Sequence, residues 1–154
     1  MLVHPEHENR LDRLTQQVRT ASAPTAELFS SVIADCTRLS TLLMSGQAAR
    51  IERLLNARAW TDAAFSLIAF ELPAWTLRRL INEDGEWMCS LSRQPHLPVT
   101  LDDAADAYHA CLPLAILGAF LEARRRAAQV RVYTRSVPQV RTVFENPLCC
   151  DNFS

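Results

Sequence analysis

The chain has 154 residues, 49% of them hydrophobic and 21% charged. This is the size and composition of one globular domain, and it excludes a chain that is disordered throughout. The formal net charge of −1 at pH 7 provides no overall field that would attract nucleic acid or an anionic membrane. All sixteen basic residues are arginines spread along the chain. A GC-rich genome also produces this bias, so it is not evidence of phosphate recognition.

The first 46 residues predict two helices. Pro5, with acidic residues after it, is typical of a helix start, and the narrow apolar stripe that follows favours a helix on the surface. The second helix begins around Thr25 and carries a wide apolar face as far as Leu43, after which Gly46 ends it.

Two more helices follow before the pattern changes. The first of them is short, with Ile51 on its inner side. Thr61 or Asp62 caps the next, and Pro73 ends it at about Leu72. The N-terminal half of the chain is therefore predicted to be helical.

A β-hairpin is predicted around Asp84-Gly85, the dipeptide most typical of a two-residue turn. Two runs rich in aromatic and branched residues flank it, residues 75–82 and 86–93. Such runs favour strands because branched and aromatic side chains pack well on a pleated surface.

The register of this hairpin has two alternatives. A plain two-residue turn sets Glu83 opposite Glu86, and like charges directly across a strand pair repel each other. A bulge near Gly85 shifts the pairing by one residue, so that Ile81 meets Cys89 and one face becomes largely apolar. We adopt the bulged register. Its apolar face consists of Trp75, Leu77, Ile81, Trp87, Cys89 and Leu91.

The C-terminal part predicts a loop and a central helix. Residues 94–99 contain two prolines and form the loop, and Thr100 with two aspartates behind it caps a helix that continues or kinks at Pro113. Residues 112–121 are almost entirely apolar, which favours a helix buried across the apolar face of the hairpin. Residues 130–134 predict a short strand that can extend the sheet, and an irregular tail follows.

The expected fold class is α+β, mainly helical, with one central β-hairpin packed on a buried C-terminal helix. Residues 1–129 form a single domain, and residues 130–154 form a basic C-terminal segment. The N-terminus lacks the apolar run of a signal peptide, and the longest apolar stretches are too short to span a bilayer. The five cysteines form no disulfide framework, so we expect a cytoplasmic protein with reduced thiols and no membrane contact.

The segment from residue 59 to residue 126 resembles a group of uncharacterised small bacterial proteins. The residues that carry the resemblance are LPAWTLRRL, EDGEWMCSLSRQP and LPLAILGAFLEARR. A hairpin followed by an alanine-rich helix is also similar in shape to small β-β-α modules of phage-encoded proteins. Neither resemblance implies an activity, a cofactor or a set of functional residues.

Cofactor and metal sites are not predicted. The three glycines are isolated, which excludes the glycine-rich loops that cradle nucleotide phosphates. The histidines and acids of the HPEHE run are metal-ligand types, but a helix start explains them without a metal. This run contains His4, Glu6, His7 and Glu8.

Catalytic residues are not predicted either. A nucleophilic cysteine needs a neighbouring base and an electropositive setting. Cys89 and Cys111 are better explained as small core residues, even though His96 and His109 lie nearby in the chain. The vicinal pair Cys149-Cys150 in the tail provides only two thiol ligands, which make an incomplete zinc site.

Arginines are the candidate contact residues. Arg79 and Arg93 fall on the inner hairpin face of the adopted register, where they form an anion pocket with the 94–99 loop, or pair with acids or protect an open sheet edge. We favour the second interpretation. A basic stretch without acids follows the central helix and contains the further candidates Arg124, Arg125, Arg126, Arg131, Arg135 and Arg141. It contacts nucleic acid, or it folds against the acidic region of residues 83–106 in its own or a second chain. Near-zero net charge favours the latter.

The function expected from these observations is a non-enzymatic interaction or assembly module. It self-associates as a dimer through the hairpin edge or the surface of the first helix, because two strands alone make a marginal sheet with exposed edges. The first alternative is an accessory nucleic-acid-binding protein that uses residues 124–141. The second is a small enzyme with a cysteine–histidine site.

Overall fold

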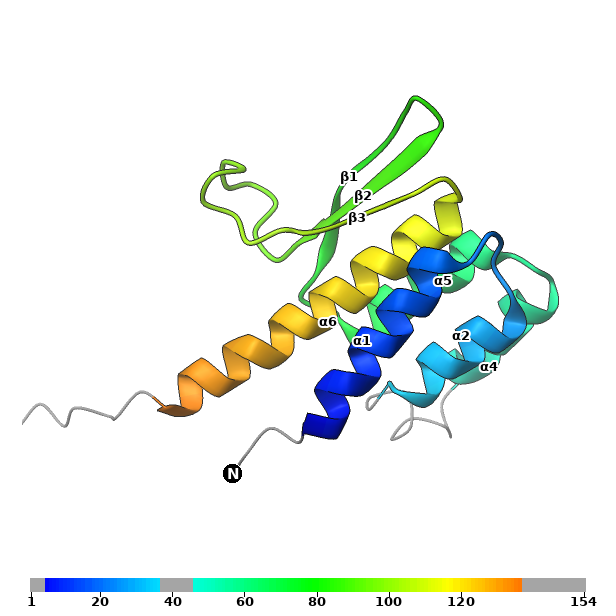
Figure 1. The fold of residues 1–154 in the computed structure, drawn as a ribbon, viewed down its shortest axis with the longest axis horizontal. Coiled ribbons are helices and arrows are strands. Elements are labelled where there is room, and N and C mark those ends of the chain that lie inside the picture. Colours follow the sequence, from blue (N-terminus) through cyan, green and yellow to red (C-terminus); the bar gives the residue numbers. More distant parts are fainter. Residues whose placement is uncertain (1–4, 37–45, 137–154) are drawn as a thin grey trace, which may run out of the picture.

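The computed structural model describes residues 5–36 and 46–136, which form an α+β fold that is mainly helical (Figure 1). A three-stranded antiparallel sheet of order β1-β2-β3 packs on the C-terminal helix. In chain order the elements are α1 (Pro5–Thr20), α2 (Ala26–Ala34), α4 (Gly46–Asn56), α5 (Trp60–Glu71), β1 (Thr76–Glu83), β2 (Glu86–Ser92), β3 (Ala105–His109) and α6 (Leu112–Ser136).

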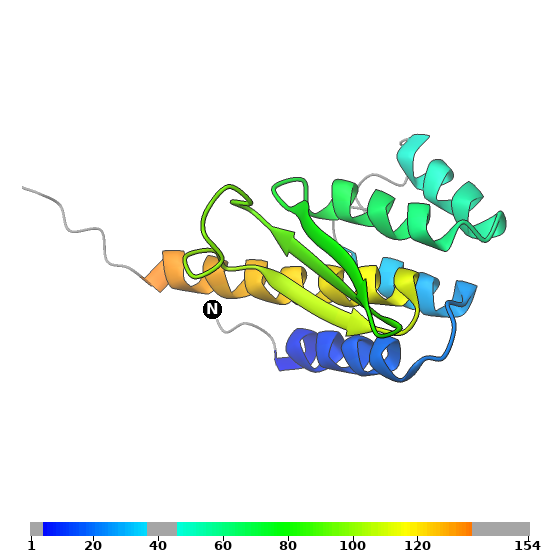
Figure 2. The same cartoon turned by 90° about the horizontal axis from the view of Figure 1, so that it is seen from above.

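The helices lie on one side of the sheet, so the molecule has two layers. Figure 2 shows the strands crossing α6 obliquely, with α1 and α5 on either side of α6. The predicted buried helix is confirmed: Leu114, Leu117 and Phe120 are among its fully buried side chains. The other face of the sheet carries no helix of the described chain.

The hairpin is confirmed, but the adopted register is wrong. Ile81 pairs with Met88, and Glu83 pairs with Glu86. Asp84 and its glycine neighbour both have positive φ angles, 53° and 85°, as a two-residue type I′ turn requires. The predicted bulge near Gly85 is absent, because both glutamates are exposed and water screens their repulsion, while the turn matches the twist of the strands.

A bulge does occur at the other end of β1, where the register slips between Leu77 and Arg79. The predicted apolar face is therefore only partly correct. Trp75, Cys89 and Leu91 are buried, and Trp87 is half-buried, whereas Leu77 is 43% exposed. Ile81 lies on the opposite face, because its partner Met88 alternates with the buried Cys89.

The predicted helix cap at Thr100 is wrong, since residues 105–109 form β3 rather than a helix. Alternation explains the difference: Ala105 and Ala107 pair with buried residues of β2, while the residues between them are exposed. Small side chains are needed here because a Cβ atom placed on Gly118 of α6 would lie 3.0 Å from the Ala107 Cβ. The helix begins at Leu112, so Pro113 stands in its first turn and not at a kink.

The third strand thus precedes α6 instead of following it. The strand predicted for residues 130–134 is wrong, because these residues continue α6 to Ser136. The residues beyond, which include Arg141 and the pair Cys149-Cys150, lie outside the described part of the chain.

The N-terminal helices confirm the predicted starts better than the predicted ends. The Thr25 hydroxyl accepts a hydrogen bond from the Leu28 amide at 3.2 Å and caps α2. However, α2 ends at Ala34, and Gly46 opens α4 instead of ending α2. The Leu43 end predicted for that helix falls outside the described residues.

The predictions for the remaining helix boundaries are partly correct. Neither Thr61 nor Asp62 caps α5, which starts at Trp60 without a side-chain cap, whereas its end before Pro73 is confirmed. The apolar stripe of α1 is buried, and α1 lies along α6 (Figure 1). That stripe consists of Leu11, Leu14 and Val18. The predicted apolar stripe of the first helix is therefore not available to a partner.

Candidate interaction surface

The outer face of the sheet is the surface that the helices leave uncovered. Residues paired across neighbouring strands point to the same face, so two rows of side chains cross it. One row is apolar and consists of Ile81, Met88 and Tyr108; the other consists of Arg79, Ser90 and Asp106. Tyr108 is 58% exposed, and Arg79 and Asp106 are also exposed.

The loop between β2 and β3, residues 93–104, lies at one end of this face. Val99 and Leu101 on it are 66% and 72% exposed, the highest values among the large hydrophobic residues described. Single exposed apolar residues are common, but several close together on one face mark an interaction site.

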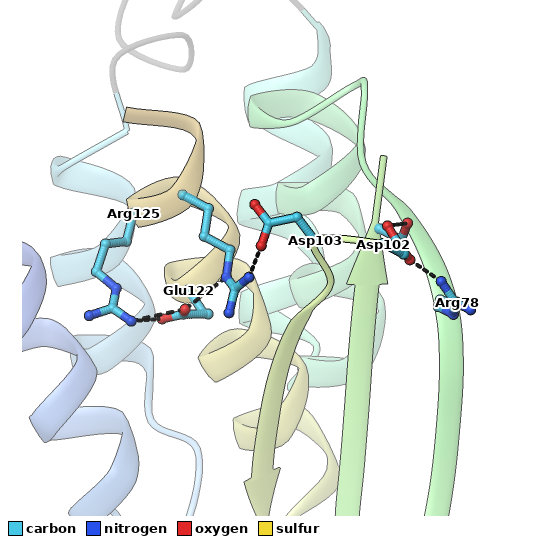
Figure 3. A network of polar contacts seen from close by, with 7 residues as sticks. Arg78, Asp102, Asp103, Glu122 and Arg125 are labelled. Carbon is cyan, nitrogen blue, oxygen red and sulfur yellow. Dashed lines mark hydrogen bonds and ion pairs between the residues drawn. The ribbon is translucent and has the colours of Figure 1, made fainter. Parts of the chain in front are cut away.

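Polar contacts fix the base of this loop. Arg78, at the bulge of β1, pairs with Asp102 (Figure 3) and donates a hydrogen bond to the Leu97 carbonyl at 2.9 Å. The Ser92 hydroxyl donates to Asp102 at 2.7 Å and accepts from the Gln94 amide at 2.9 Å. The loop therefore presents its apolar residues from an anchored base. Arg78 could not be predicted from the sequence, because the side of the strand on which it lies depends on the bulge.

Arg79 and Arg93, which were predicted on the inner face of the hairpin, are both exposed. Arg93 stacks over the Trp75 ring, with its guanidinium carbon 5.5 Å from the ring centroid. Arg79 stands on the outer face. The register accounts for the error at Arg79, because a one-residue slip in β1 moves its side chain to the opposite face.

Arg124 is buried and connects three helices. Its Nη1 and Nη2 donate to the Asp35 carboxylate and the Asp35 carbonyl, each at 2.8 Å, so α6 is tied to the C-terminal end of α2. Its Nε lies 4.0 Å from the Glu71 carboxylate of α5. Arg10 of α1 also pairs with Asp35, at 3.2 Å. Arg124 therefore holds the helical layer together and is not available to an external partner.

Arg125 and Arg126 are paired within the chain as well. Both contact Glu122 one turn earlier, and Arg126 also pairs with Asp103 (Figure 3). Burial alone would raise the pKa of Glu122, but the hydrogen bonds from the two arginines lower it below its ordinary value. The Arg126–Asp103 pair is a contact between the basic segment and the acidic region of the same chain. Arg131 and Arg135 lie in α6, where the structure does not describe their side chains.

The cysteine and histidine candidates have structural roles. Cys89 is fully buried; burial, with a smaller effect of Asp106, raises the pKa of its thiol to about 12. His109 has both ring nitrogens engaged: Nδ1 accepts from the Cys111 amide at 2.8 Å, and Nε2 lies 3.0 Å from the Ala21 carbonyl, to which it donates in this tautomer. It therefore bridges the α1–α2 connection to the start of α6 and offers no free base to Cys111.

Hollows in the surface do not point to a particular ligand. One of them, with a volume of about 710 Å³, is an open groove between α4 and α5 with Leu54, Phe65 and Phe70 along it. Among the described residues there is no group of three or more His, Cys, Asp or Glu side chains that could hold a metal ion. The side chains of His4 and His7 are not described.

Comparison with protein-family models, with curated proteins and with solved structures finds no match for this chain. The described residues also contain no helix that is both long and apolar enough to cross a membrane. The candidate site is therefore defined by its geometry alone.

Proposed function

We propose that the chain is a non-enzymatic interaction module that self-associates through the outer face of its sheet. The observation that carries this proposal is the apolar row on the uncovered face, in which Ile81 and Met88 are half-buried and Tyr108 is 58% exposed, together with the exposed Val99 and Leu101 of the adjoining loop. A sheet face that is apolar and uncovered is stabilised by packing against a second surface.

The face is a better contact than the two surfaces considered from the sequence. The free edge of β1 is interrupted by the bulge at Arg78, and bulges protect edges from pairing. The apolar stripe of α1 is already buried. Self-association through the outer face of the sheet requires no change at the bulged edge of β1 or at the buried apolar stripe of α1.

The size of the face sets the expected affinity. Three strands about 4.8 Å apart, with seven residues of about 3.3 Å each, cover roughly 300 Å². A standard interface buries about 800 Å² on each partner. The loop of residues 93–104 enlarges the contact, and we expect a dimer with a dissociation constant of micromolar order.

Light scattering coupled to size-exclusion chromatography, at about 10 to 200 µM protein, tests the proposal. We expect the mean mass to rise towards that of a dimer with concentration. Tyr108→Asp places a charge in the apolar row and should abolish this rise. Asn82→Asp is the matched control, because Asn82 is also exposed but pairs with Trp87 on the inner face. A wild-type chain that stays monomeric throughout contradicts the proposal.

A cytoplasmic location belongs to the same proposal. Cys36, Cys89 and Cys111 are free thiols, as is usual for proteins of a reducing compartment.

A further inference from the structure

We infer that two copies pack sheet against sheet about a two-fold axis parallel to β2, with Arg79 of each copy opposite Asp106 of the other. This inference rests on the proposed self-association and specifies its geometry.

The arrangement of charge on the outer face is the first step. Arg79 lies on β1 and Asp106 on β3, at the same level along the strands, because both pair with Ser90 of the central strand. The face therefore carries a cation on one side and an anion on the other, with a small residue between them. Neither side chain makes an ion pair within the described residues, so both are available to a partner.

The symmetry of a dimer is the second step. A two-fold axis makes the same patch contact itself. If the axis runs parallel to β2, it exchanges the β1 and β3 sides and keeps the levels along the strands. Arg79 then faces Asp106 of the second copy, and the same pair forms a second time by symmetry. In the neighbouring row Ile81 faces Tyr108, and Met88 faces Met88.

The alternative axis, perpendicular to the strands in the plane of the interface, is less favourable. It keeps β1 against β1, so Arg79 faces either Arg79 or an apolar residue of the second copy. Opposed like charges and charges set against apolar groups both oppose association. Both axes keep the strands of the two sheets aligned within about 30°, as aligned packing requires, so the charges decide between the axes. The axis parallel to β2 places the exposed loops of the two copies, residues 93–104, at the same end of the interface.

Charge reversal tests the pairing. Arg79→Asp and Asp106→Arg each replace two attractive pairs by two repulsive ones, and we expect each to raise the dimer dissociation constant about tenfold at low salt. The double variant restores both pairs in reversed order and should return the constant to within about twofold of wild type. Circular dichroism and the urea midpoint of each variant confirm that the monomer is folded.

The possible outcomes separate the inference from the proposed function. A monomeric wild-type chain overturns both. A wild-type dimer for which the double variant is as weak as the single ones, or for which no reversal has an effect, overturns the pairing and leaves self-association in place.

Cross-linking provides a second measurement that does not depend on charge. Packed sheets lie about 10 Å apart, too far for a disulfide but within reach of a short bis-maleimide. Met88→Cys lies on the proposed axis and should give a peptide linked from residue 88 to residue 88. Asn82→Cys, on the inner face, should give no such link to itself. Equal yields from the two variants overturn the proposed axis.

Discussion

Arg124 shows how single residues hold the helical layer together. Its side chain is 7% exposed, and that of its partner Asp35 is 3% exposed. A buried charge that loses its partner is costly, whereas the pair itself contributes little beyond that compensation. The guanidinium also lies over the Phe120 ring, at 5.8 Å from the centroid, so its removal loses packing as well.

Arg124→Met should therefore lower the free energy of unfolding by about 3 to 5 kcal/mol. Arg125→Met is the control: its side chain is 48% exposed, and its pair with Glu122 lies on the surface, so a loss below about 1 kcal/mol is expected. Urea denaturation followed by circular dichroism measures both values. Equal losses from the two variants contradict the structural role of Arg124.

The two fully buried thiols predict how stability depends on pH. Burial raises the pKa of Cys36 and of Cys89 from 9.0 to about 12. Above pH 9 the unfolded chain loses these protons while the folded chain keeps them, so stability that is fully present below pH 9 is lost as the pH rises towards 12. Each thiol contributes a slope of up to about 1.4 kcal/mol per pH unit.

Urea denaturation at several pH values from 7 to 11 measures this slope. Cys89→Ala should remove about half of the alkaline loss, whatever its effect at neutral pH. An unchanged slope in this variant would mean that the thiol of Cys89 reaches solvent in the native state.

At the scale of elements, the contact of β3 with α6 depends on two small residues. A Cβ at position 118 would lie 3.0 Å from the Ala107 Cβ, closer than such atoms normally approach. Gly118→Ala gains helix propensity worth about 1 kcal/mol but has to push β3 away. In the Ala107→Gly background the contact disappears and only the gain remains.

A double-mutant cycle of Gly118→Ala and Ala107→Gly should therefore show a coupling free energy of about 0.5 to 3 kcal/mol, with Gly118→Ala more favourable when residue 107 is glycine. Thermal or urea unfolding of the four proteins gives this value. Additive effects would show that β3 is free to move away from the helix.

The same elements show how far the sequence predicts this fold. Periodicity and turn chemistry predict the hairpin and the buried helix, because these signals are local. The strand β3 was missed because ADAYH contains small residues that also suit a helix, and its pairing with β2 is a tertiary effect. The outer-face row was missed because the repulsion between Glu83 and Glu86 was given more weight than the geometry of the Asp84-Gly85 turn.

At the scale of the whole molecule, Arg124, Arg125 and Arg126 of α6 are paired with acidic residues of the same chain. The basic residues from Arg124 onwards were candidates for nucleic-acid contact, yet Arg124 is paired with Asp35, and Arg126 is paired with Glu122 and Asp103. Non-specific nucleic-acid affinity grows with the number of cations free to meet phosphates. A protein rather than a nucleic acid is therefore the partner that we propose; the side chains of Arg131 and Arg135 are not described.

The hairpin end provides the last test of the proposed dimer. Glu86 lies on the central strand and pairs with Glu83 of β1, so an axis parallel to β2 sets Glu86 opposite Glu86 of the second copy. Glu83 stands to one side of that axis and does not face itself. Glu86→Gln should therefore tighten the dimer roughly two- to fivefold at low salt, as expected for removal of one exposed like-charge pair. Added salt should reduce the difference from wild type.

Glu83→Gln is a closely matched control, because both substitutions remove the same repulsion within the hairpin and should change monomer stability alike. Sedimentation equilibrium of the two variants separates the effects, and equal association constants would show that β2 does not lie along the symmetry axis.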